Sequence, residues 1–130
     1  MKSNLRFISS ASEIDSEILE LHHDGLSGQL AMFTGTQGDF IVSIVPSLNV
    51  SGYGRTETEA LESLSENLDT FFSDFFALEK AERHQELHNL GWSGDFHFEH
   101  PLSPSYIDNG GVLKNFDFPE KVKKTTLQAA

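Results

Sequence analysis

The chain has 130 residues and a formal net charge of -11, from 20 acidic and 9 basic residues, and it contains no cysteine. The length fits a single domain. The missing cysteines exclude disulfides and cysteine-ligated zinc or iron–sulfur sites, and the negative charge argues against direct nucleic-acid binding. No apolar stretch is long enough for a signal peptide or a membrane-spanning helix, so we expect a cytoplasmic protein that does not bind a membrane.

The first part of the chain predicts one strand and one segment that stays open between two structures. Residues 5–8 have the composition of a short strand. Within residues 12–21, apolar residues recur at the spacing of a short amphipathic helix, although an extended conformation fits equally well. Asp24-Gly25 and Gly28 then indicate a turn or loop.

The next section predicts three consecutive strands joined by turns. The first two are rich in β-branched residues and are separated by a glycine-containing break at residues 35–39. Pro46 ends the second strand because proline cannot donate a hydrogen bond to a neighbouring strand. Gly52 and Gly54 close the third. The predicted strands are residues 29–34, 40–45 and 48–53.

The strongest element is an amphipathic helix that opens at Thr56. Thr56 and Glu59 have the capping-box spacing, in which a threonine hydroxyl and a glutamate satisfy free backbone donors at a helix start. Apolar residues then repeat at intervals of three and four, which predicts a helix lying on a sheet. We expect it to reach Leu78, and a weaker pattern continues to Gly91. The apolar stripe comprises Ala60, Leu61, Leu64, Leu68, Phe71, Phe72, Phe75 and Phe76.

The last third predicts irregular structure with a strand or two. Alternation in residues 95–99 predicts a strand with Phe96 and Phe98 on one face, and residues 112–116 are a further strand candidate. Prolines at 101 and 104 indicate a loop between them. We therefore predict an α+β fold with a small, mostly antiparallel sheet and one long helix. The expected organisation is a single domain over residues 1–118, which includes a C-terminal β/loop extension at 79–118, followed by a flexible tail at 119–130.

Three segments carry a family resemblance. They are Val45-Pro46-Ser47-Leu48, Gly52-Tyr53-Gly54-Arg55-Thr56 and Glu57-Thr58-Glu59-Ala60-Leu61. In this order and spacing, they resemble the HicB-like domain, the antitoxin half of HicA–HicB toxin–antitoxin pairs. The resemblance covers residues 29–78 and implies a β-β-β-α core that is a trimmed relative of ribonuclease H. Its structural motif consists of Pro46, Gly52, Gly54, Thr56 and Glu59. The chain departs from the family at Ser47, where an acid is usual, and at Asn49-Val50, where Pro-Gly is usual.

For function, the resemblance implies a non-catalytic protein-interaction module, since a HicB antitoxin neutralises a small basic ribonuclease toxin. We expect an antitoxin or an orphan relative that binds a basic partner protein on its acidic surface. The first candidate residues are Glu57, Glu62, Glu66 and Asp69. Residues 79–130 do not predict the DNA-binding module that many relatives carry. The predicted strands hold no cluster of metal-binding carboxylates, so we expect neither nuclease activity nor a cofactor.

Two other functions stay open as weaker alternatives. His84 and His88 stand one helical turn apart, a spacing that can hold a metal ion in a histidine-dependent enzyme. A zinc-protease motif requires glutamate directly after the first histidine, however, and the residue here is Gln85. Surface histidines therefore explain the pair better. The second alternative is a small-molecule site beside Trp92 and Phe96.

Four phenylalanines near the end of the predicted helix exceed what one sheet-facing stripe can hold, because neighbouring residues differ by about 100° around a helix. They are Phe71, Phe72, Phe75 and Phe76. We expect residues 87–118 to cover the excess, through Leu87, Leu90, Trp92, Phe96, Phe98 and Phe116. A homodimer interface through these rings is the alternative.

Overall fold

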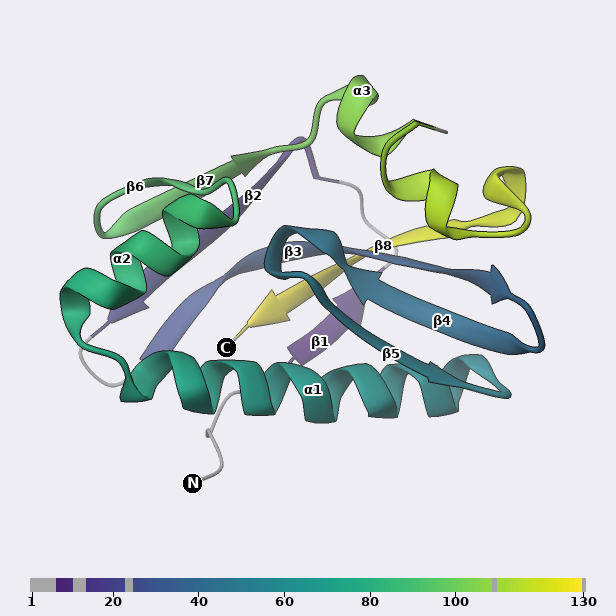
Figure 1. The fold of residues 1–130 in the computed structure, drawn as a ribbon, viewed down its shortest axis with the longest axis horizontal. Coiled ribbons are helices and arrows are strands. Elements are labelled where there is room, and N and C mark those ends of the chain that lie inside the picture. The colour runs from purple at the N-terminus through teal and green to yellow at the C-terminus, as the bar shows by residue number, and fades with distance from the viewer. Residues whose placement is uncertain (1–6, 11–13, 23–24, 109, 130) are drawn as a thin grey trace.

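The computed structural model describes residues 7–10, 14–22, 25–108 and 110–129 (Figure 1). Within these ranges the chain has an α+β fold, with eight strands in one antiparallel sheet, three α-helices and three short 3-10 helices. This confirms the predicted fold class. The strands are β1 (Phe7–Ser10), β2 (Ser16–His22), β3 (Gly25–Gln37), β4 (Phe40–Val45), β5 (Val50–Gly54), β6 (Ser93–Gly94), β7 (His97–Pro101) and β8 (Lys123–Ala129). The helices are α1 (Glu57–Ala77), α2 (Lys80–Asn89), α3 (Pro104–Ile107), η1 (Pro46–Leu48), η2 (Val112–Asn115) and η3 (Pro119–Lys121).

The long central strand β3 organises the sheet. β8 pairs with β3 from Gly28 to Thr34, and this stretch overlaps the parts of β3 that pair with β2 and with β4. A strand has two edges, so β2 and β4 must both use the edge opposite β8. β2 pairs with β3 up to Gln29 and β4 pairs from Phe33 onward, so that residues 30–32 lie between them. The sheet therefore forks along one edge of β3, as Figure 1 shows where β2 and β4 diverge.

One face of the sheet is covered by α1 and α2. Alternate residues of β3, including Leu26, Leu30 and Met32, point to this face and join the main hydrophobic core. α1 crosses β4 and β5 at close range because β5 presents Gly52 and Gly54 to it. A Cβ atom on Gly52 would overlap the backbone of α1, so glycine allows this close approach.

The opposite face is partly covered by residues 102–122, which contain α3, η2 and η3. Ala31 and Phe33 of β3 point to this face and pack against Val112 and Phe116. On this same face, the part of the sheet formed by β1, β2 and β7 carries polar and exposed residues. The structure thus has two cores, a large one beneath the helices and a small one beneath residues 102–122.

The chain end differs most from expectation. Residues 119–130 were predicted as a flexible tail, but residues 123–129 form β8, which lies between β1 and β3 in the sheet. Thr126, Leu127 and Ala129 are buried there. The lysines and small polar residues of this segment resemble a solvated tail, and its strand structure comes from pairing with partners far away in the sequence. The tail prediction was therefore wrong.

Several smaller predictions also change. Of the two structures left open for residues 12–21, the extended one is found at residues 16–21, which belong to β2 and place positions 17, 19 and 21 on one inward face. β3 begins at Gly25 and continues through Gly28, where a turn was expected. Residues 112–115 form the 3-10 helix η2, which Phe116 caps, rather than a strand. The predicted hairpin strands and the helix that follows them are confirmed.

The predicted helix ends at Ala77 and a separate helix follows. Leu78 and Glu79 are extended, and the side chains of Glu79 and Glu82 form a capping box that starts α2. Arg83 donates hydrogen bonds to the carbonyl oxygens of Phe76 and Leu78 at 3.0 and 2.9 Å, which satisfies acceptors left free at the end of α1. These contacts let the chain change direction there.

Candidate functional site

The exposed side of α1 carries acidic residues and no basic ones. The helix carries carboxylates at positions 57, 59, 62, 66, 69 and 74 and has no lysine, arginine or histidine. Glu62, Glu66 and Asp69 are separated by four and three residues, which places them along one line of the helix surface. Glu62 and Glu66 are exposed, whereas Asp69 is half-buried. We call these three residues the acidic stripe.

Glu57 does not belong to the acidic stripe. It precedes Glu62 by five residues and therefore points to another side of the helix. Its Oε2 lies 2.8 Å from Nζ of Lys123 in β8, and both side chains are more than half exposed. Of the four acidic residues predicted as a partner-binding set, three thus form one continuous surface and the fourth is already paired with a lysine.

The motif residues at the start of α1 have structural contacts. The Thr56 hydroxyl accepts a hydrogen bond from the Glu59 N–H at 3.1 Å, as a helix N-cap does. The Glu59 carboxylate accepts from the Arg55 N–H at 3.1 Å, one residue before the position expected in a capping box. Pro46 opens η1, the short turn that joins β4 to β5. These residues shape the β4–β5–α1 unit.

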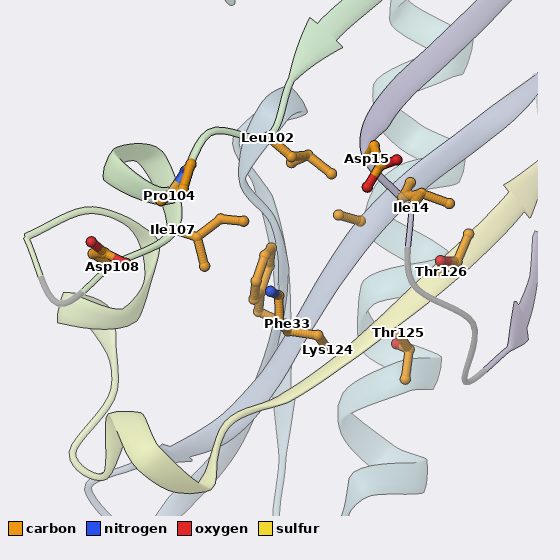
Figure 2. Close-up of a pocket in the computed structure, with 11 residues that line it drawn as sticks. Ile14, Asp15, Phe33, Leu102, Pro104, Ile107, Asp108, Lys124, Thr125 and Thr126 are labelled. Atoms are coloured by element: carbon orange, nitrogen blue, oxygen red, sulfur yellow. The ribbon is translucent and has the colours of Figure 1, made fainter.

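A pocket of about 500 Å³ lies on the face of the sheet opposite α1 (Figure 2). Phe33 of β3 forms its floor, Ile14 approaches from one side, and Leu102 and Ile107 approach from the other. Its polar groups include Lys124 and two aspartates. This pocket is not the small-molecule site expected beside Trp92 and Phe96, because neither residue lines it. The Trp92 side chain is 2 % exposed in the main core, whereas Phe96 is 61 % exposed, so the two do not share one environment.

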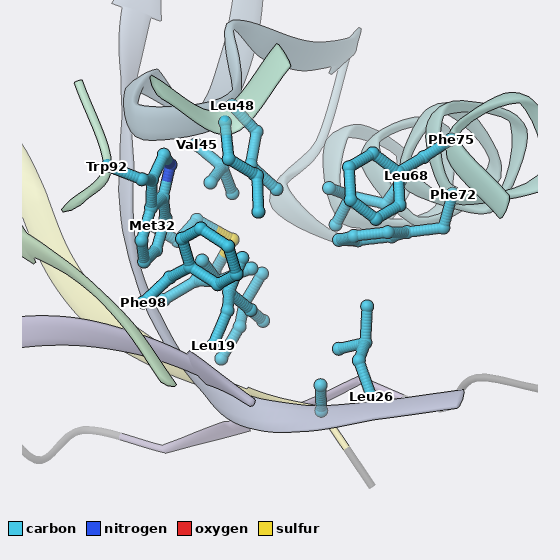
Figure 3. Close-up of a cluster of buried hydrophobic side chains, with 14 of the residues drawn as sticks. Leu19, Leu26, Met32, Val45, Leu48, Leu68, Phe72, Phe75, Trp92 and Phe98 are labelled. Carbon is cyan, nitrogen blue, oxygen red and sulfur yellow. The ribbon is translucent and has the colours of Figure 1, made fainter. Parts of the chain in front are cut away.

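The four phenylalanines of α1 pack into one aromatic cluster. Phe72 and Phe75 are buried, and their rings meet edge to face at 6.1 Å between centroids. Phe71 and Phe76 are partly buried at the edge of the same core. Figure 3 shows Phe72 and Phe75 together with Leu68, across from Trp92 and Phe98.

The expected cover for these rings is partly confirmed. Leu87, Leu90, Trp92 and Phe98 join the core that contains them. Phe116 instead packs on the opposite face of the sheet, and Phe96 is exposed, so neither of these two covers the cluster. Phe76 also receives the Arg83 guanidinium, whose carbon lies 5.6 Å from the ring centroid. The homodimer interface through these rings stays a prediction.

His84 and His88 both pack around Phe98 rather than facing one another across a shared site. His84 Nδ1 lies 3.2 Å from the Asp95 carboxylate, and His88 Nε2 lies 3.2 Å from the Gly94 carbonyl oxygen. Their rings stand 5.4 and 6.1 Å from that of Phe98. Among the described residues, no three histidine, aspartate or glutamate side chains are grouped so that they could hold a metal ion.

His97 and His100 lie on opposite faces of β7, as strand alternation requires. His97 is exposed and lies between two carboxylates. Hydrogen bonds to Glu20 and then to Glu99 raise the pKa of His97 above its ordinary value. His100, by contrast, is buried on the face covered by the helices.

A buried polar cluster at the fork of the sheet was not predicted from the sequence. Glu17 of β2 is 0 % exposed and fills the gap on the edge of β3 between β2 and β4. Its Oε2 accepts hydrogen bonds from the Ala31 N–H at 3.0 Å and from the Ser47 hydroxyl at 2.6 Å. The Trp92 indole N–H donates to the Ser47 carbonyl at 2.9 Å. The cluster therefore joins β2, β3, η1 and the turn after α2.

The rest of this cluster comes from β7 and α3. His100 Nδ1 lies 3.8 Å from Glu17 Oε1, and the His100 ring contacts the rings of Trp92 and Tyr106 at 5.4 and 5.1 Å. Burial raises the pKa of Glu17 from 4.5 to about 7, although the bonds from Ser47 and Ala31 oppose part of that rise. Burial and the nearby Glu17 charge raise the pKa of Tyr106 to about 12.

One signal in the sequence pointed to Glu17. If residues 16–22 are taken as a strand, Glu17 falls on the same face as Leu19 and Leu21, where a carboxylate is unexpected. The helical interpretation of the same residues hides this placement. Nothing local indicates Ser47 or His100 as partners of Glu17, because the three residues lie far apart in the chain.

No protein-family model matches the chain, and neither the curated proteins nor the solved structures compared with it give a match. In the part of the chain that the structure describes, no helix combines the length and apolar character needed to cross a membrane. The resemblance to the HicB-like domain therefore rests on the residues and the element order of positions 29–78.

Proposed function

We propose that this protein is a non-catalytic interaction module that binds a basic protein partner through the acidic stripe, as an antitoxin or an orphan relative of HicB-like antitoxins. The observation that carries the proposal is the charge of α1. A helix with six carboxylates and no basic residue presents a field of one sign to solvent. Such a surface attracts a basic partner and speeds its association.

The helix α1 itself contributes no basic residue to this surface. Four of the described lysines fall between residues 114 and 124, in η2, η3 and β8. Glu57 of α1 forms an ion pair with one of them, Lys123. Exposed ion pairs contribute only about 0.2–1 kcal/mol each. Tight binding would therefore need several carboxylates acting together, which the spacing of the acidic stripe permits.

The order of elements supports the relation to HicB-like antitoxins. β3, β4 and β5 form a three-stranded antiparallel unit, and α1 follows and packs on β4 and β5. At the position after the proline, where the family usually has an acid, Ser47 donates a hydrogen bond to Glu17. A carboxylate thus lies beside this position in the present chain too, although a different strand supplies it.

Co-purification with charge-reversed variants tests the proposal. The full chain is tagged and recovered from its native cells in three forms: wild type, Glu62→Lys/Glu66→Lys, and the control Asp39→Lys/Glu120→Lys. Both double variants change exposed acids and alter the net charge equally. We expect wild type and control to retain a basic protein that is released by salt, and the Glu62/Glu66 variant to lose it.

Two results would contradict this function. Recovery of no basic protein with the wild-type chain would remove the basis for a toxin-like partner. Equal retention by the Glu62/Glu66 variant and by the control would show that the partner binds some other surface.

A further inference from the structure

The polar cluster at the fork contains a buried carboxylate oxygen with no hydrogen-bond partner. Glu17 Oε2 accepts from both the Ala31 N–H and the Ser47 hydroxyl, whereas Oε1 receives no hydrogen bond from the described residues. Buried polar atoms in proteins are nearly always paired, because water cannot replace the missing bond. When Glu17 is protonated, its hydrogen belongs on Oε1, since Oε2 already accepts from two donors.

A donor lies just beyond the reach of this oxygen. His100 Nδ1 is 3.0 Å from the Pro101 carbonyl oxygen and 3.8 Å from Glu17 Oε1. A carbonyl oxygen can only accept, so Nδ1 must carry the hydrogen. Because 3.8 Å is too long for a hydrogen bond, the imidazole N–H bonds to Pro101 and not to Glu17. The His100 N–H thus has two acceptors within a small movement of the ring.

The Pro101 carbonyl stands where β7 ends and the chain leaves the sheet. Residues 102–108 then cross over the pocket, with Leu102 and Ile107 among its lining. Tyr106 in the same segment packs its ring on His100 at 5.1 Å between centroids. His100 therefore contacts this segment at two places, the Pro101 carbonyl where it starts and Tyr106 in α3. A movement of the His100 ring alters both contacts.

We propose that His100 transfers its Nδ1–H bond from the Pro101 carbonyl to Glu17 Oε1 when Glu17 ionises, and that this exchange loosens residues 102–108 over the pocket. When Glu17 is protonated, the hydrogen on Oε1 would point at the imidazole N–H, and two donors cannot bond to each other. The His100 N–H therefore keeps its bond to the Pro101 carbonyl. With Glu17 ionised, Oε1 becomes a charged acceptor, and hydrogen bonds to charged acceptors are stronger than those to neutral carbonyls.

Titratable groups face Glu17 from two elements, His100 on β7 and Tyr106 on α3. β3 and η1 contribute neutral donors, the Ala31 N–H and the Ser47 hydroxyl. Burial places the pKa of Glu17 at about 7, and the pKa of Tyr106 at about 12 keeps that side chain protonated in this range. We therefore assign a step near neutral pH in this cluster to Glu17, and the experiment tests that assignment.

Nuclear magnetic resonance of the 15N-labelled full chain tests this assignment, in a titration from about pH 5.5 to about pH 8.5. Trp92 is the only tryptophan, so its indole N–H, which bonds to Ser47 beside Glu17, gives one reporter signal. We expect this signal and the amides of residues 102–108 to shift with a common midpoint near pH 7. Glu17→Gln should lose that step, and His97→Gln, on the other face of β7, should keep it.

The same data can overturn the proposal. If Glu17→Gln retains the step with an unchanged midpoint, a group other than Glu17 titrates and the exchange does not depend on Glu17. Wild-type amides of residues 102–108 that do not shift would also overturn it. If Glu17→Gln does not fold, Ser47→Ala provides the test, because it removes a bond that lowers the pKa of Glu17. Its midpoint must then move to higher pH, and an unmoved midpoint refutes the mechanism.

Discussion

Replacing Glu17 by glutamine should remove a large part of the dependence of stability on pH. Burial raises the pKa of this carboxyl from 4.5 to about 7, so the folded protein binds the proton more tightly than the unfolded chain does. Its contribution to the unfolding free energy is complete below about pH 4.5 and is lost as pH rises through about 7. At roughly 1.4 kcal/mol for each unit of pKa, the whole loss is about 3 kcal/mol.

Glutamine has nearly the same shape and can accept the hydrogen bonds from Ala31 and Ser47 with its amide oxygen. The variant should therefore gain about 2–3 kcal/mol relative to wild type between about pH 5 and pH 8. Urea denaturation of both proteins at the two pH values measures this difference directly, and other titrating groups cancel in the comparison. A difference between the proteins that does not change with pH would refute the view that Glu17 carries a proton near neutrality.

Three further predictions concern the fold. Gly52→Ala should lower the melting temperature by forcing α1 away from β5, at a cost of about 1–3 kcal/mol, whereas Gly25→Ala, which meets no atom within 4 Å, should have a much smaller effect. Thr56→Ala should destabilise the protein by about 1 kcal/mol in urea unfolding through loss of the N-cap, and a change near zero would contradict that role. Leu127→Ala should cost about 2–5 kcal/mol because β8 is part of the core, while the exposed Gln128→Ala should cost little, and equal effects would argue for a free chain end.

The sequence alone was sufficient for the elements whose signals are local. The hairpin of β3 and β4 follows from β-branched runs around glycines, and α1 follows from its cap and from apolar repeats of three and four. These patterns depend only on interactions between residues that lie a few positions apart in the sequence. The acidic side of α1 belongs to the same class, because helix periodicity directly places Glu62 and Glu66 on the outer surface.

Tertiary structure decided everything that depends on distant partners. β8 looks like a solvated tail until β1 and β3 pair with it. The pattern of residues 12–21 fits two structures, and pairing with β7 and β3 selects the strand for residues 16–21. Glu17 meets Ser47 and His100 only because the sheet forks along β3, and that fork exists only once the strands are paired. Strand alternation in residues 16–22 hints at the inward position of Glu17. Pairing between strands and the partners of this carboxylate are non-local, so no pattern within a short window of sequence records them.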